Sequence, residues 1–425
     1  MRIVLRIFLA LAVLQASSSL FAAAETPSRE YVGFVLKSCD RVEGEMEKIT
    51  QTAETMAKRH LAGGQLGLHI NGNPLPEEIC GRSGGVVHLG FDRPFKTDRT
   101  DAEKKNDIAF ASWVRPPADT ELAALKTLKG SGCMIIGFGP KAMPQLAEIV
   151  KTCDVWFDTG FGADDLVIHL PHQKMSGDGN LVVETLQSWA LIGEFVSALT
   201  RQGKMPTMYK SYVTPGGREW GDKYFLKKQF HDDYKIAPIP DGKLARDFLG
   251  HIRGLVERFR DTQLTEVNKA ADMIATEFAR GRKTLVATSG HMPYTFVCHY
   301  GDQEWAETMD IHASLESQMK SYEEQSREGA LVLRIGYAGM HTTEIALYKK
   351  KKQTVMLIVA EHPDKDWQPP ADLPVRIEMG YAYGDACVPI EGYPIKILPP
   401  SGIMQLVAYK CVEVEVESRL AAKSK

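Results

Sequence analysis

The hydrophobic pattern of this chain alternates between short apolar runs and longer amphipathic segments. Continuous apolar runs at residues 108–114, 133–138 and 355–360 are typical of strands buried on both faces. Shorter strands are predicted at residues 65–71, 84–90, 154–157, 283–288 and 330–336. Apolar residues spaced three and four positions apart predict helices at residues 29–63, 120–129, 141–151, 181–200, 247–260, 264–280, 342–350 and 401–420. Because strands and helices alternate, we predict an α/β fold with mainly parallel sheets.

One stretch of this pattern occurs twice. Residues 49–80 align without a gap with residues 267–298, at an offset of 218. The identical pairs are Ala53/Ala271, Ala57/Ala275, Gly63/Gly281, Gly72/Gly290 and Cys80/Cys298. A repeat of this length indicates two copies of one domain, and the alternative is a chance similarity of two amphipathic helices. We expect domains at residues 30–205 and 263–425, separated by an aromatic-rich connector at residues 206–262.

Composition adds little to this picture. A length of 425 residues suits two or three domains, and 44% hydrophobic and 25% charged residues are ordinary for a globular protein. A formal net charge of −3 gives no reason to expect nucleic acid or an anionic membrane as a partner. The four lysines at residues 349–352 stand where a predicted helix ends, and cations suit that end of a helix.

The N-terminus has the pattern of a secretory signal peptide. Arg2 and Arg6 precede an apolar run at residues 7–14, and three alanines at residues 22–24 offer a cleavage site. An uncleaved anchor is the alternative. No later stretch is apolar enough to span a membrane. We therefore expect residues 1–24 to be removed and the mature protein to be exported, to the periplasm or another extracytoplasmic location.

Cysteines and histidines show no metal or redox motif. The seven cysteines include no CxxC pair, and export would permit one or two disulfides that the sequence does not pair. His169 and His172, and separately His231 with Asp232 and Asp233, lack a third ligand at a recognised spacing. We predict no metal and no cofactor.

Three stretches of the second half resemble the SIS (sugar isomerase) domain family of bacterial proteins. They are GRKTLVATSGHMPY at residues 281–294, LVLRIGYAGMHTTE at residues 331–344, and the GD, PIEG and PPSG motifs at residues 384–385, 389–392 and 399–402. The resemblance implies two three-layer αβα domains, each with a mainly parallel sheet of about five strands. It also implies a sugar or sugar phosphate as ligand and a homodimer. Ligands of open parallel sheets bind beyond the strand carboxyl ends, where helix N-termini attract phosphate.

The chain departs from the family at the phosphate loop. Gly339 is retained, but Gly336 and Ala338 stand where the family has serines, and the first copy keeps only Ser112. Each missing hydrogen bond to an anion would cost about 1.5–3 kcal/mol. The loop is therefore either degenerate or suited to a different ligand.

The candidate site residues come from the loops that follow the predicted strands. Thr288, Ser289 and Gly290 could bind an anion with His291 as an acid or base, although an ordinary capped turn has the same pattern. Glu344 could abstract a proton beside a sugar carbonyl, although Thr followed by Glu also starts helices. The remaining candidate ligand-binding residues are Gly339, Thr342 and Thr343 in the second half and Asn71, Asn73 and Ser112 in the first.

These residues leave three functional hypotheses open. The first is an exported sugar- or sugar-phosphate-binding protein that acts as an aldose–ketose isomerase through Glu344 and His291. The second is a non-catalytic carbohydrate-binding or envelope scaffold protein, and the third, weaker one is a metal-dependent hydrolase. The sugar hypotheses predict that the loops at residues 71–74, 112–120, 288–294 and 336–344 converge on one polar pocket.

Overall fold

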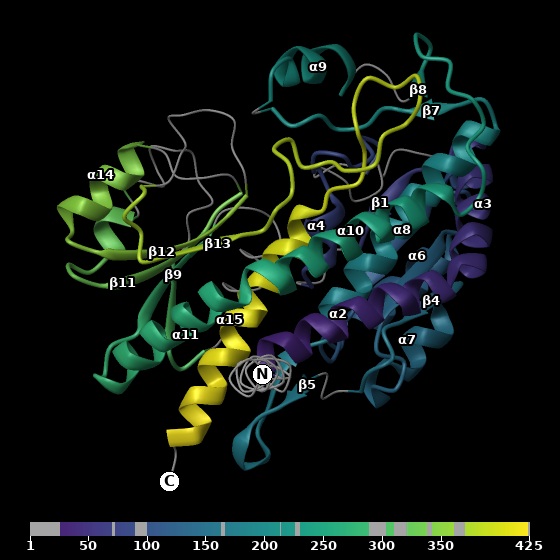
Figure 1. Ribbon diagram of the computed structural model, residues 1–425. Helices are drawn as coiled ribbons and strands as arrows, with labels where there is room; N and C mark the ends of the chain where they lie inside the picture. Colours follow the sequence, from purple (N-terminus) through teal and green to yellow (C-terminus); the bar gives the residue numbers. More distant parts are fainter. Residues whose placement is uncertain are drawn as a thin grey trace, which may run out of the picture.

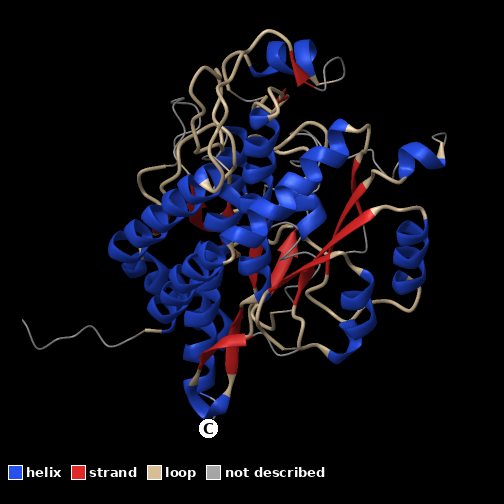
Figure 2. Cartoon of the chain, turned by 90° about the vertical axis from the view of Figure 1, so that its right-hand side faces the viewer, coloured by secondary structure: helices blue, strands red, loops and turns tan. Residues whose placement is uncertain are grey.

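Two parallel β-sheets and a layer of long helices between them make up the protein (Figures 1 and 2). The computed structural model describes residues 26–69, 73–89, 100–162, 166–212, 214–225, 230–288, 303–309, 320, 322–337, 342–360 and 370–423. Every strand pair within the two larger sheets is parallel. The α/β class and the parallel sheets predicted from the sequence are confirmed.

The first sheet has four strands in the order β1-β2-β3-β4. Their bounds are Leu66–Leu68, Ile108–Ser112, Met134–Gly139 and Val155–Asp158. Successive side chains of a strand point to opposite faces, and both faces are covered. Ile135 packs with α6 (Glu121–Gly130) and α7 (Ala147–Thr152), whereas Ile136 enters the main core with α3 (Met46–Leu61) and α8 (Asn180–Arg201). This half is therefore three layers thick.

The second sheet has five strands in the order β10-β9-β11-β12-β13. Their bounds in chain order are Thr284–Thr288 for β9, Ala306–Met309 for β10, Leu331–Ile335 for β11, Thr354–Val359 for β12 and Val375–Glu378 for β13. Helix α14 (Thr342–Lys350) covers one face, and α11 (Leu264–Ala279) and α15 (Ser401–Lys423) cover the other. The strand order reverses between β9 and β11, which makes that point the topological switch of the sheet.

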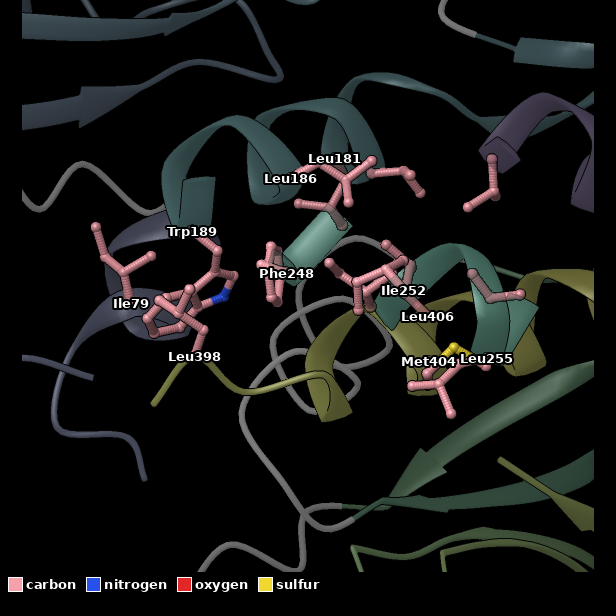
Figure 3. Close-up of a cluster of buried hydrophobic side chains, with 14 of the residues drawn as sticks. Ile79, Leu181, Leu186, Trp189, Phe248, Ile252, Leu255, Leu398, Met404 and Leu406 are labelled. Carbon is pink, nitrogen blue, oxygen red and sulfur yellow. The ribbon is translucent and has the colours of Figure 1, made fainter. Parts of the chain in front are cut away.

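Four long helices cross between the sheets and share one core. Helix α2 (Pro27–Gly44) packs on α15 and α8, and α10 (Lys243–Thr262) packs on α8 and α2. Figure 3 shows the apolar side chains where α8, α10 and α15 meet, including Leu186, Phe248 and Leu406. Helices α8 and α15 touch each other, but α8 makes more extensive contact with α10, and α15 makes more extensive contact with α2.

The two halves present their elements in the same order. Helices α3 and α11 begin at Met46 and Leu264, and β1 and β9 begin at Leu66 and Thr284, which is the offset of the sequence alignment. The pairs β3/β12, β4/β13 and α8/α15 follow at similar spacing. The strands that contain Leu68 and Val286 both run parallel to their neighbours.

One predicted strand is wrong. Residues 84–89 form no sheet strand; Val86 makes only an isolated antiparallel bridge with Met208. Gly84 has a φ of +79°, a left-handed value that interrupts an extended strand. The carbonyl of Tyr209 instead accepts a hydrogen bond from the Gly84 amide, so this segment is tied to the connector.

The connector is ordered, and its last helix belongs to the core. β7 (Met205–Pro206) pairs with β8 (Phe230–His231), and α9 (Gly217–Tyr224) lies between them in the chain. The helix predicted at residues 247–260 is α10, which is longer and buries its apolar face between α2 and α8. The remaining short elements are α4 (Leu75–Ile79), α5 (Asp101–Lys104), η1 (Pro144–Leu146), η2 (Pro171–Gln173) and the hairpin β5 (Leu166–His169) with β6 (Met175–Asp178).

None of the helices among the described residues combines the length and the apolarity that crossing a membrane requires. Five of the six cysteines among the described residues are buried.

Candidate functional site

The carboxyl ends of β9 and β11 lie side by side at the switch point of the second sheet. Thr288 and Ile335, the last residues of these strands, are register partners. The two loops predicted to hold the site in this half leave the sheet from these neighbouring residues. Ligands of open parallel sheets bind at such a point, so this edge is the candidate site.

Thr288 is the candidate ligand-binding residue that the structure describes best. Its side chain is 1% exposed, and its hydroxyl has no hydrogen-bond partner among the described residues. A buried hydroxyl without a partner costs about 1–3 kcal/mol, so a bound ligand that accepts or donates a bond here would recover that loss. Ser289, Gly290, His291 and Gly339 lie outside the described residues.

Glu344 lies in the first turn of α14 and is already engaged. Its carboxylate accepts from the Arg334 guanidinium at 2.5 Å and from the Tyr348 hydroxyl at 2.6 Å, and both charged side chains are buried. Oε1 of Glu344 accepts both of these bonds, so this oxygen is occupied by partners within the protein. Its role as a base stays a prediction. Thr342 is exposed at the start of the same helix, where Thr343 follows it.

The first half brings Asn73 and Ser112 to the carboxyl edge of its own sheet. Asn73 Oδ1 accepts from the Val114 amide at 3.1 Å, and Ser112 ends β2 in a buried position. Trp113 stacks on Trp156 with 5.6 Å between the ring centroids. Aromatic side chains therefore fill this edge. Asn71 lies outside the described residues.

The described parts of the four predicted loops fall into two pairs. Asn73 and Ser112 lie at the first sheet, whereas Thr288 and Thr342 lie at the second. The prediction that all four loops meet in one pocket stays untested, because residues 71–72, 289–294 and 338–341 of three of these loops lie outside the described residues.

A buried charge cluster joins the two halves, and sequence reasoning missed it. The Arg82 cluster comprises Glu78, Arg82, Asp385 and Ser401, all nearly inaccessible to solvent. The Arg82 guanidinium pairs with Glu78 and, at 3.3 Å, with Asp385, and it donates to the Ser401 hydroxyl. Trp189 of α8 donates its indole N–H to Glu78 at 3.0 Å. Figure 3 shows this indole beside Ile79 and Leu398.

The Arg82 cluster occupies the N-terminus of α15. Asp385 Oδ1 accepts from the Ser401 amide at 3.0 Å, and Oδ2 accepts from the Ser401 hydroxyl at 2.7 Å. Burial raises the pKa of Glu78 to about 7 and also raises the pKa of Asp385, although the Arg82 charge opposes both shifts. When both acids are ionised, Glu78 and Asp385 carry two negative charges, and Arg82 supplies only one positive charge.

The Arg82 cluster lies close to the candidate site. Tyr337 follows β11, and its carbonyl accepts from the Tyr381 hydroxyl at 3.1 Å. Burial raises the pKa of the Tyr337 phenol, and the nearby Asp385 carboxylate raises it further. Tyr383 lies beside the same ring, with 6.2 Å between centroids. The switch-point edge is therefore bordered by three tyrosines and one buried charge cluster.

A groove of about 470 Å³ lies at the opposite edge of the second sheet. Its charged lining residues pair with one another or with neighbours: Glu277 with Arg280 and Arg282, and Asp272 with Arg419. The groove therefore offers a ligand few free charges. Within the part of the chain that the structure describes, no group of three His, Cys, Asp or Glu side chains is placed to hold a metal ion.

No family model matches this chain, and no curated protein sequence matches it. Solved structures with related names do align with most of it. A candidate phosphosugar isomerase from Clostridium difficile aligns over 92% of this chain and 93% of its own, at 9% identity and a TM-score of 0.48. For a candidate sugar-binding protein from Salmonella typhimurium the coverages are 93% and 99%, at 10% identity and a TM-score of 0.47. Tagatose-6-phosphate ketose/aldose isomerase from Escherichia coli covers 94% both ways, at 10% identity and a TM-score of 0.46.

The names of these neighbours refer to sugar binding or to isomerisation of sugar phosphates, as the resemblance of the sequence led us to expect. Their TM-scores are below 0.5 at about one identical residue in ten, so the likeness by itself assigns neither a ligand nor a reaction to this chain. The function has to rest on the chain's own residues.

Proposed function

We propose that this protein binds a sugar or a sugar derivative at the switch-point edge of its second sheet. The observation that carries the proposal is the position of Thr288. Its buried hydroxyl lacks a partner among the described residues, at the strand end where this topology binds ligands. Tyr337 and Tyr383, both half-buried, add ring faces and hydroxyls at the same edge. Ligand sites typically combine such aromatic surface with a few polar groups.

Isothermal titration calorimetry with a panel of free hexoses, hexosamines and their 6-phosphates tests the proposal. Thr288→Val removes only the hydroxyl and should weaken binding of the ligand at least tenfold. Thr284→Val is a matched control, because Thr284 is the first residue of the same strand and its buried hydroxyl also lacks a partner among the described residues. The absence of binding in the wild type, or an equal loss in both variants, would contradict the proposal.

Binding without turnover is the version that the contacts of Glu344 favour. This carboxylate is buried and already accepts from Arg334 and Tyr348, so it is engaged within the protein. The competing version is an aldose–ketose isomerase that uses Glu344 and His291. That version predicts hydrogen–deuterium exchange at C2 of a bound sugar phosphate, abolished in Glu344→Gln. Binding without exchange would leave the non-catalytic version.

We also propose that the chain is a tandem duplication and that it is exported. The equal order of elements in the two halves supports the duplication, with a first unit at residues 30–205 and a second at residues 263–425. Export rests on the N-terminal pattern alone. Expression in a bacterium, followed by N-terminal sequencing of the periplasmic fraction, should give a mature chain that begins at Glu25. An intact N-terminus in the cytosol would contradict export.

A further inference from the structure

The N-terminus of α15 lies near the candidate site, because Asp385, which caps it, is close to the Tyr337 phenol. Free amides at a helix N-terminus attract anions, but two carboxylates of the protein itself already occupy the N-terminus of α15. Asp385 accepts from both the amide and the hydroxyl of Ser401. Glu78 approaches Gly402 so closely that a side-chain carbon there would collide with its carboxylate. Two internal carboxylates thus stand where an external anion would bind.

The charge balance of the Arg82 cluster opposes a further anion. Arg82 is the cation between Glu78 and Asp385, and it is fully buried with them. At a pH above the pKa of about 7 of Glu78, both carboxyls are ionised, and two negative charges against one guanidinium leave an excess negative charge in a region of weak screening. A phosphate at the neighbouring edge would experience that charge as repulsion.

A second buried cation near the strand ends also has a salt-bridge partner within the protein. Arg334 of β11 pairs with Glu344 at 2.5 Å. The first turn of α14, the other helix that starts at this edge, therefore contains a carboxylate. Exposed Arg258 of α10 donates to the Gly380 carbonyl beyond β13, so this guanidinium also has a partner within the protein.

The uncharged groups at the edge suit a different ligand. Thr288 offers a hydroxyl, and the half-buried Tyr337 and Tyr383 offer ring faces whose centroids lie 6.2 Å apart. Aromatic faces pack against the C–H surface of a sugar ring, and hydroxyls pair with its hydroxyl groups. None of these contacts requires a negative charge on the ligand.

We infer that the site takes a sugar without a phosphate group, either neutral or carrying an amine. This inference rests on the proposed sugar-binding function and narrows its ligand class. Asp385 and Glu78 act as specificity-determining residues, because they occupy and charge the helix terminus that would otherwise attract a phosphate.

Calorimetry with matched pairs tests the inference: glucose against glucose 6-phosphate, and glucosamine against glucosamine 6-phosphate. We expect each free sugar that binds to bind at least tenfold more tightly than its own 6-phosphate. Tighter binding of the 6-phosphates would overturn the inference while leaving the sugar site intact. Failure of all four to bind would overturn the proposed function and the inference with it.

Two variants sharpen the result. At pH 8, where Glu78 is ionised, Glu78→Gln removes one internal negative charge and should shift the affinity ratio at least threefold towards the 6-phosphate. Glu77→Gln, at the exposed neighbouring position, should not shift it. An unchanged ratio in a folded Glu78→Gln variant would contradict the role given to that charge. Arg258→Gln tests the alternative, a phosphate subsite at Arg258. A 6-phosphate affinity that is high in the wild type and lost in this variant would support that subsite and overturn the inference.

Discussion

The buried carboxyl of Glu78 makes a quantitative prediction about how the stability depends on pH. Its pKa is about 7 in the folded protein, against 4.5 for an ordinary glutamate, because burial disfavours the charge. The folded state therefore binds more protons than the unfolded state between these two values. Stability from this group is fully present below pH 4.5 and is lost as the pH rises through 7. The difference amounts to about 3 kcal/mol.

Glu78→Gln removes the titration. At pH 4.5 Glu78 is protonated in the folded wild type, so its carboxyl and the glutamine amide each offer one carbonyl oxygen to Trp189 and Arg82. We therefore expect the stabilities of variant and wild type to differ by less than about 1 kcal/mol at that pH. By pH 8 the variant should gain about 3 kcal/mol relative to the wild type, because only the wild type then holds a buried charge in excess of its counter-charge.

Urea denaturation, followed by tryptophan fluorescence at pH values from 4.5 to 8, measures this difference. The readout is the change in the difference between variant and wild type with pH, so other titrating groups cancel. Glu77→Gln is the control and should give a flat difference, because Glu77 is exposed. Parallel stability curves for Glu78→Gln and the wild type would refute the reasoning.

The remaining predictions concern other buried contacts. Asp385→Ala removes the cap of α15 and one partner of Arg82, and should cost about 3–5 kcal/mol in urea denaturation; a loss below 1 kcal/mol would contradict the burial of the pair. Gly402→Ala should cost about 1–3 kcal/mol by collision with Glu78, whereas Gly250→Ala, which meets no atom within 4 Å in α10, should stabilise by about 0.5–1 kcal/mol. His60 has a pKa lowered by burial, so its stability contribution is present above pH 6.5 and is lost as the pH falls through the folded-state value; His60→Phe should flatten the acid side of the stability curve, and an unchanged curve would argue against it.

Periodicity was enough to predict the elements that the structure builds from continuous apolar runs. The helix at residues 342–350 and the strand at 355–360 agree with α14 and β12 to within a residue. β13 and β10 were missed, because β13 alternates buried and exposed residues over only four positions and β10 buries only its two ends. Such short strands carry too little pattern to stand out from a loop.

The candidate site was only partly accessible to sequence reasoning. Gly384–Asp385 and Ser401–Gly402 were recognised as motifs, but nothing in the sequence linked them to Glu78 and Arg82, about 300 positions away. Ion pairs between distant segments depend on how the halves pack, and local pattern does not encode that. The one local signal was the spacing of four residues between a glutamate and an arginine in an otherwise apolar segment, a pairing distance on a helix.

The crossed arrangement of the long helices has a consequence for how the chain reaches its native state. Helix α2 lies against α15, which is remote from it in the chain. Contacts between such remote segments form slowly, so one face of α2 stays uncovered until α15 has been synthesised. Premature termination within the 23 residues of α15 would remove a helix that packs on both α2 and α11.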